Sequence, residues 1–391
     1  MQEAETIIRE PDVPDRMIDV VEAFDCPCQT RTYVDAYRAW RRRKKNRYAF
    51  AFTKHPKEAS FAENRAVVND SPTQAEKSAL YRVSMLIGCV LIGYLVLENV
   101  FDKLLVTVLG SFGYHIELLY WGESRLYGDE SVVFLVTVLV SVVKYLVPAA
   151  LLMAILRLPL PVVLPVKFVH KSPVLYGVAL TMIVSDVFGM LIADYSSEMN
   201  KYRLISDAVS INDHRIIQYI LFSVFGLPFL AELLLHGAMF QLLRQFGDSF
   251  AVLCCSLTAA LLTHNVLDAV RMGLMYLLIS RFMLQSGSFL TALLLRFIHE
   301  IYMFGLYYIS TFGQAYSLQW WITTLLPVGI GLIAGCIYLT KRRKPRPELR
   351  REGNTYLNLY DRFSTWLSAF PTTAFVITSM ILLVVNAILE A

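Results

Sequence analysis

Three apolar stretches between Leu230 and Met303 contain ionisable side chains where a membrane-spanning helix ordinarily has none. They are Glu232 and His236 in the first stretch, His264 in the second, and Arg296, His299 and Glu300 in the third. Ionisable groups at membrane depth are costly, so they usually face the interior of a helix bundle and indicate a functional site.

Glu232 and His236 are four residues apart, which places them within about 40° of each other on one helical face. A carboxylate and an imidazole one turn apart can bind one metal ion, such as zinc, or share one water molecule. The alternative is that the two groups hydrogen-bond each other and a neighbouring helix. His264 has a similar alternative as a satisfied polar group near a helix end, but the imidazoles at depth in the stretches before and after it favour a site.

Arg296 and Glu300 are also four residues apart, a spacing that predicts an intrahelical ion pair. His299 lies one step off that face. The alternative to a functional role is a neutralised pair buried for packing.

A third group of charges could line a polar path of the kind that transporters use. They are Lys144, Asp186, Asp268, Arg271 and Arg281. For Asp268 and Arg271 the alternative is a position at a helix end, from which the side chains reach the membrane surface. The chain shows no pair of interrupted spans in two similar halves, which argues against a small-solute transporter.

The composition, 56% hydrophobic and 17% charged residues, is typical of a chain whose bulk lies in lipid. The six cysteines lie mostly in apolar runs and predict neither a disulfide framework nor a zinc ribbon. From Tyr81 onward, apolar runs of about 20 residues predict an all-α, polytopic membrane bundle. The nine predicted spans lie near 82–99, 131–156, 174–194, 216–243, 249–266, 267–286, 288–310, 317–339 and 372–390.

Charges in the connecting segments predict the orientation, because short cytoplasmic loops contain an excess of Lys and Arg. The loop 100–130 is mainly acidic and is expected outside, whereas the basic cluster that begins at Lys341 is expected inside. The N-terminus is therefore predicted to be cytoplasmic and the C-terminus to lie outside. Residues 355–371 suit a helix along the cytoplasmic interface.

Residues 1–80 form one long polar arm without the pattern of a cleaved signal peptide. Seven basic residues between Arg38 and Arg47 lie beside Tyr37, Trp40 and Tyr48. The pattern is compatible with a patch for anionic headgroups or nucleic acid. A cytoplasmic anchor next to the membrane is the favoured interpretation, with lipids and not nucleic acid as the partner. The remaining divisions are N-terminal spans at 81–159, a core at 160–310 and C-terminal spans at 311–391.

The order of these motifs resembles the CAAX-processing and bacteriocin-processing (CPBP, or Abi) intramembrane proteases. Their pattern is E-E-x-x-x-R-G, then F-x-x-x-H, then H-x-x-x-N on successive core helices. The residues Gly237–Ala251 and Ser286–Phe289 are similar to the family's flanking segments. The resemblance covers about residues 160–310 and implies a CPBP-like core in a bacterial plasma membrane.

The chain also departs from that pattern. Ala231 and Glu232 stand at the two glutamate positions, and His236 stands at the arginine position before Gly237. Ala260 replaces the phenylalanine, and His264 is kept. Arg296 and Glu300 replace the third motif's histidine and asparagine. In that family, the first glutamate and the two histidines activate water, directly or through a metal, and the asparagine supports the oxyanion.

Two functional hypotheses follow from the resemblance. In one, the chain is an endopeptidase of prenylated or leader-bearing peptides, with Glu232 and His264 as catalytic residues. A zinc ion would then be held by Glu232, His236, His264 and His299. The other hypothesis, which is favoured, is a catalytically inactive protein. Ala231 cannot act as a base, and the permanent charge of Arg296 replaces a metal. Such a protein would bind a peptide or partner, as in bacteriocin immunity, without a cofactor. The direction of the Arg296 guanidinium distinguishes the two hypotheses. Contact with Glu232 favours the inactive protein, whereas contact with Glu300 beside an imidazole-lined pocket favours the endopeptidase.

Overall fold

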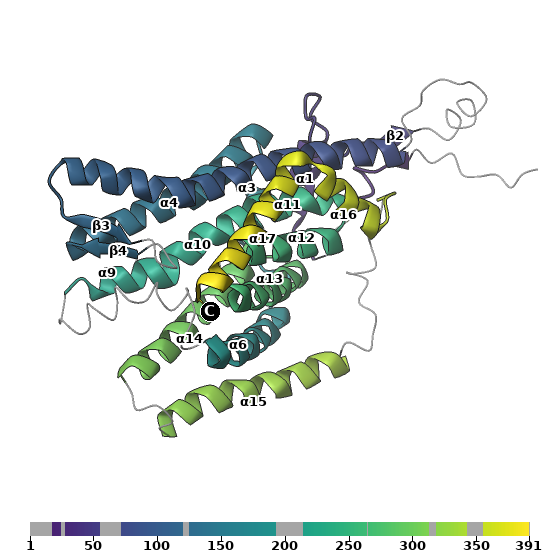
Figure 1. The fold of residues 1–391 in the computed structure, drawn as a ribbon. Helices are drawn as coiled ribbons and strands as arrows, with labels where there is room; N and C mark the ends of the chain where they lie inside the picture. The colour runs from purple at the N-terminus through teal and green to yellow at the C-terminus, as the bar shows by residue number, and fades with distance from the viewer. Residues whose placement is uncertain are drawn as a thin grey trace, which may run out of the picture.

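The computed structural model describes residues 18–24, 28–54, 72–119, 125–192, 214–263, 265–312, 318–341 and 355–390. The fold over these residues is helical, with two short antiparallel strand pairs (Figure 1). Strand β1 (Ile18–Asp19) pairs with β2 (Thr53–Lys54), and β3 (Ile116–Leu119) pairs with β4 (Arg125–Gly128). The predicted all-α fold class is therefore confirmed.

Six helices in the described part of the chain are long and apolar enough to cross a membrane. They span Pro72–Ser111, Ser131–Leu156, Ile216–Phe246, Phe289–Ile309, Trp321–Thr340 and Phe370–Ile388. These helices indicate a multi-pass membrane protein. Helices also cover the other three predicted segments, as α6 (Ser172–Ile192), α12 (Asp248–Leu261) and α13 (Val266–Ser286).

The first helix, α3 (Pro72–Ser111), is much longer than the predicted span 82–99. The predicted span lies within this helix, which continues beyond the apolar run in both directions because polar and charged residues can also be helical. Asp102 is in fact buried against the bundle within α3. Helix α3 packs against α4 (Glu130–Leu156) and α17 (Phe370–Glu390).

The segment from Ile216 to Phe246 is a continuous helical rod with two widened turns, η1 (Leu221–Gly226) and η2 (Leu233–Met239). They flank α10 (Leu227–Glu232), and α9 (Ile216–Ile220) and α11 (Phe240–Leu243) complete the regular parts. Pro228 lacks an N–H and disturbs the regular helical ladder nearby. Widened turns of this kind are frequent at functional sites, and His236 lies in η2.

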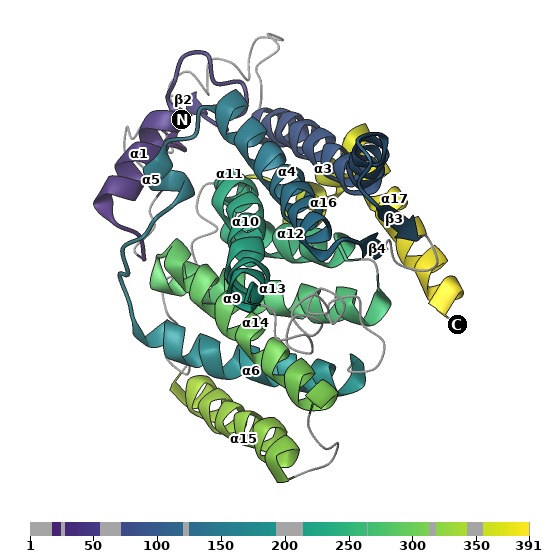
Figure 2. The same ribbon diagram turned by 90° about the vertical axis from the view of Figure 1, so that its left-hand side faces the viewer.

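The rod packs against α14 (Phe289–Phe312) and α4, while α13 packs against α6, α12 and α14. Helix α15 (Leu318–Lys341) lies on the outside of α6, as both views show (Figures 1 and 2). The central helices therefore provide the buried faces on which the ionisable side chains lie.

The two ends of the bundle differ in structure. One end has α1 (Arg31–Arg41) and α16 (Leu359–Ser368), and the opposite end has the β3–β4 pair (Figure 1). The predicted helix within 355–371 corresponds to α16. Residues of the N-terminal arm pack onto the core: Tyr33 and Tyr37 are buried, and their hydroxyls donate to the side chain and backbone oxygens of Gln241.

Candidate functional site

Glu232 and His236 interact directly, as their spacing predicted. The Nδ1 of His236 hydrogen-bonds with a carboxylate oxygen of Glu232, and both side chains are completely buried. The Nε2 of His236 lies 2.8 Å from the hydroxyl oxygen of Ser280 on α13. Both ring nitrogens are therefore engaged by other side chains.

Tyr276, one turn before Ser280 on α13, covers the imidazole of His236. The two rings stack with centroids 5.3 Å apart and planes 7° apart. The order carboxylate, imidazole, hydroxyl is that of a hydrolase triad. Ser280 is fully buried, however, so no substrate carbonyl reaches its hydroxyl in this arrangement. The geometry is that of a buried polar network.

His299 belongs to a second network. Arginine can only donate, so the contact of 3.0 Å from Arg271 Nη1 makes His299 Nε2 an acceptor. The ring proton then lies on Nδ1, which donates to Ser185 Oγ at 2.6 Å, and Ser185 donates to the carbonyl of Thr181 at 2.7 Å. Each donor has an acceptor along this chain, and His299 offers no lone pair to a metal.

Asp268 joins the His299 network through an ion pair of 3.0 Å with Arg271. Both side chains are fully buried. Their interpretation as charges that reach the membrane surface from a helix end is therefore wrong. The sequence could not reveal this, because the burial comes from the packing of α13 against α6 and α14.

Arg296 makes the predicted ion pair with Glu300, with 2.6 Å between Nη2 and Oε1. Its Nη1 lies 3.2 Å from the sulfur of Met272, and its guanidinium carbon is 5.9 Å from the Tyr276 ring centroid. The guanidinium thus contacts Glu300, which is the first condition for the active form. The second condition is a pocket lined by imidazoles, and the described pocket beside Arg296 is lined differently.

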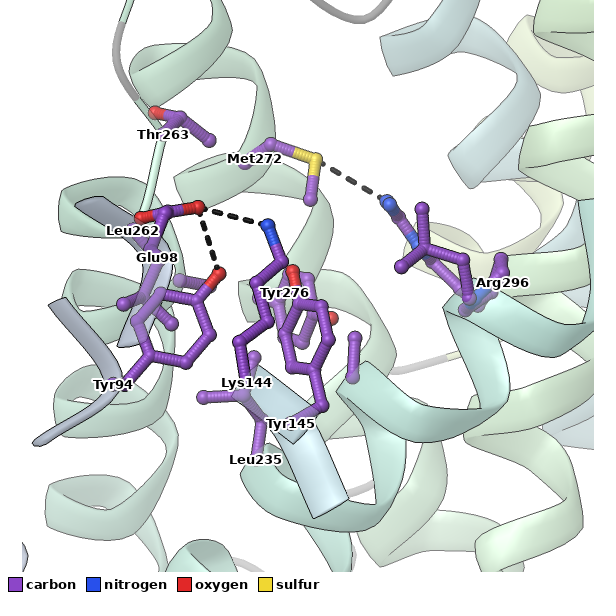
Figure 3. Close-up of a pocket in the computed structure, with 14 residues that line it drawn as sticks. Tyr94, Glu98, Lys144, Tyr145, Leu235, Leu262, Thr263, Met272, Tyr276 and Arg296 are labelled. Atoms are coloured by element: carbon purple, nitrogen blue, oxygen red, sulfur yellow. Dashed lines mark hydrogen bonds and ion pairs between the residues drawn. The ribbon is translucent and has the colours of Figure 1, made fainter. Parts of the chain in front are cut away.

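This pocket is a cavity of about 190 Å³ between α3, α4, the 216–246 rod, α12, α13 and α14 (Figure 3). Ala231 and Arg296 both line it, and so do Tyr276 and Thr263. Two positions of the predicted motifs therefore meet at one cavity. Glu232, the retained acid, is instead directed to His236.

The opposite wall contains a partly buried ion pair, of which the sequence analysis had singled out only the lysine. Lys144, near the middle of α4, lies 2.8 Å from Glu98 of α3, and the Tyr94 hydroxyl lies 3.3 Å from the same carboxylate oxygen (Figure 3). The Lys144 ammonium also lies 5.7 and 5.3 Å from the ring centroids of Tyr94 and Tyr145. Glu98 was not singled out because it stood at the end of a predicted span. The signal that could have found it is a carboxylate in an apolar run that has a lysine, Lys144, in the next run as a possible partner.

Among the described residues, the proposed zinc ligands Glu232, His236 and His299 do not form a zinc site. A zinc ligand must offer a lone pair, and the nitrogens of His236 and His299 are engaged in two separate networks. Within the described residues, no three His, Cys, Asp or Glu side chains are grouped as metal ligands. His264 lies outside the described residues.

The structure thus brings Ala231 and Arg296 to one cavity, with Tyr276 between Arg296 and the Glu232–His236 pair. It places His299 in the other network. No protein-family model matches the chain, and no curated protein or solved structure matches it. The resemblance to the CPBP proteases therefore stays a prediction.

Proposed function

We propose that this protein is a catalytically silent, CPBP-like membrane protein that binds a peptide or a lipidated partner in the cavity without cutting it. The observation that supports this most is the composition of the cavity wall. Ala231 and Arg296, which line it, replace a proposed base and a proposed metal ligand. Neither can activate water, because alanine has no proton acceptor and arginine stays protonated.

The finer architecture belongs to the same proposal. All nine helical segments cross the plasma membrane, with the N-terminus in the cytoplasm and the C-terminus outside, and residues 160–310 form the CPBP-like core. With about 190 Å³ the cavity has room for one side chain or for part of a lipid chain, and it combines apolar side chains such as Leu235 and Met272 with the charges of Lys144 and Arg296.

The proposal is tested by metal content and by restoration of the motifs. We expect the purified wild-type protein to hold far less than about one zinc per chain, and Glu232→Ala to leave that content unchanged. The triple variant Ala231→Glu/Arg296→His/Glu300→Asn should gain metal, because it returns a carboxylate and an imidazole to the cavity. About one zinc per wild-type chain, lost in Glu232→Ala or His264→Ala, would instead establish the endopeptidase.

Binding is measured separately with an S-farnesylated tetrapeptide that has a photoreactive group. We expect it to crosslink to α10, α13 or α14 of the wild type with its mass intact. Ala231→Trp should abolish crosslinking, because the indole fills the cavity, whereas Leu294→Trp, at an exposed position on α14, should not. A cleaved probe, or equal crosslinking in both variants, would contradict the proposal.

A further inference from the structure

The turn that follows α1 presents a group of cations on the protein surface. Arg43, Lys44, Lys45 and Arg47 are all exposed, and among the described residues none of them has a carboxylate partner. We call residues Arg43–Arg47 the cationic loop. It differs from the preceding Arg42, whose guanidinium pairs with Asp19 at 2.9 Å and Glu22 at 2.6 Å.

Hydrogen bonds hold the cationic loop in one conformation. The Asn46 side chain donates to the carbonyl of Trp40 at 2.9 Å and accepts from the backbone N–H of Tyr48 at 3.2 Å. The backbone N–H of Asn46 donates to the carbonyl of Arg43 at 2.9 Å. The charged side chains therefore project from a fixed turn, which reduces the entropy lost when they bind an anion.

The loop is fixed to the end of a membrane-length helix. Trp40 is completely buried, and its indole N–H donates to the carbonyl of Leu156, the last residue of α4, at 2.8 Å. Arg43 Nη1 donates to the carbonyl of Arg157 at 2.9 Å. Because α4 has the length and hydropathy of a membrane span, its end marks the depth of the lipid headgroups.

Apolar side chains are exposed shortly after Arg157, the residue whose carbonyl oxygen accepts from Arg43. Helix α5 (Leu160–Val163) packs against α1 (Figure 2), and its Leu160 is 67% exposed. Val166, just after α5, is 53% exposed. Apolar side chains beside cations at headgroup depth are typical of a surface that lies on an anionic membrane.

We propose that the cationic loop, together with Leu160, binds the phosphoryl headgroup of an anionic glycerophospholipid. The ammonium and guanidinium groups contact the phosphate, and Leu160 contacts the first methylenes of the acyl chains. This site is separate from the cavity, so it rests on α4 as a membrane span but not on the binding of a peptide in the cavity.

The test uses the full-length protein in a mild neutral detergent. Thermal unfolding is followed while short-chain (dioctanoyl) phosphatidylglycerol, dioctanoyl phosphatidylcholine or inorganic phosphate is added. The variant Lys44→Gln/Lys45→Gln/Arg47→Gln removes three exposed charges and leaves the Arg43 contact intact. The control Arg31→Gln/Lys77→Gln/Arg82→Gln removes three other exposed charges and changes the net charge equally.

We expect phosphatidylglycerol to raise the melting temperature of the wild type and of the control. Phosphatidylcholine and inorganic phosphate should raise it much less at the same concentration. The phosphatidylglycerol concentration that gives half of this rise should be at least about tenfold higher for the loop variant, since each cation near a membrane surface strengthens lipid attraction severalfold. Equal titrations of the loop and control variants would overturn the proposal. If inorganic phosphate produced the full rise in melting temperature at the concentration at which phosphatidylglycerol does, the bound anion would be free phosphate and not a lipid.

Discussion

Glu232 and His236 form one network with Ser280, a residue 44 positions later in the chain than His236. The spacing of four was sufficient to predict that the acid and the imidazole share a face. It could not predict the third member, because Ser280 comes from α13 and meets the pair only through helix packing. The same limit applies to His299, whose partners Ser185 and Arg271 come from α6 and α13.

A buried pair of this kind predicts a specific pattern of stability. Glu232→Leu should lower the free energy of unfolding by about 3–5 kcal/mol, because it leaves the imidazole buried beside an apolar side chain. The double variant Glu232→Leu/His236→Leu should lose less than this single variant, because a well-packed apolar pair can replace a buried ionic one. Denaturation in detergent measures both, and a double variant less stable than the sum of its singles would contradict a structural role.

At the scale of the elements, apolar runs located nine helical segments, six of which are long and apolar enough to cross a membrane. The pattern did not reveal where α3 ends, nor the widened turns η1 and η2 in the rod. Pro228, which has no N–H, lies two residues after η1, and η2 packs against α4; hydropathy describes neither feature. The cavity also could not be predicted from single helices, because residues of several helices line it.

The contact between α3 and α17 can be tested at Gly88. A Cβ added there would meet the carbonyl carbon of Pro371 at 2.6 Å, as well as the backbone of Thr372. Gly88→Ala should therefore lower the free energy of unfolding by about 1–3 kcal/mol.

Gly93 is the matched control on the same helix, because a Cβ there meets nothing within 4 Å. Gly93→Ala should be neutral or stabilising by up to about 1 kcal/mol, as alanine favours the helix. Thermal unfolding in detergent compares the two variants. Equal effects would show that α17 does not pack closely on α3.

For the whole molecule, immersion in lipid explains why so many apolar side chains are exposed. Leu332 and Ile333 on α15 are 57% and 64% exposed, and Ile388 on α17 is 69% exposed. In water such a surface would associate, whereas lipid tails solvate it. Composition was enough to predict this environment, while the orientation across the membrane still depends on charges such as the segment 342–351, which lies outside the described residues.

Two exposed cysteines test the immersion directly. Cys89 on α3 and Cys336 on α15 should not react with a membrane-impermeant maleimide in sealed vesicles of a Cys26→Ser variant, because a thiol in hydrocarbon does not ionise. Both should react after denaturation. The positive control is Gly110→Cys, near the end of α3. It should react in a second set of vesicles that have been made permeable to the reagent, so that both faces of the membrane are reached. Reaction of Cys89 in those same vesicles would place that turn of α3 in water.

The length of α3 has a consequence for where the protein can reside. Its 40 residues extend about 60 Å, roughly twice the thickness of the hydrocarbon layer. Bilayers that differ by a few ångströms would simply cover different turns of this helix, without tilting or stretching it. Sorting between thin and thick membranes would then depend on shorter helices such as α17, whose apolar window extends only from Phe370 to Ile388.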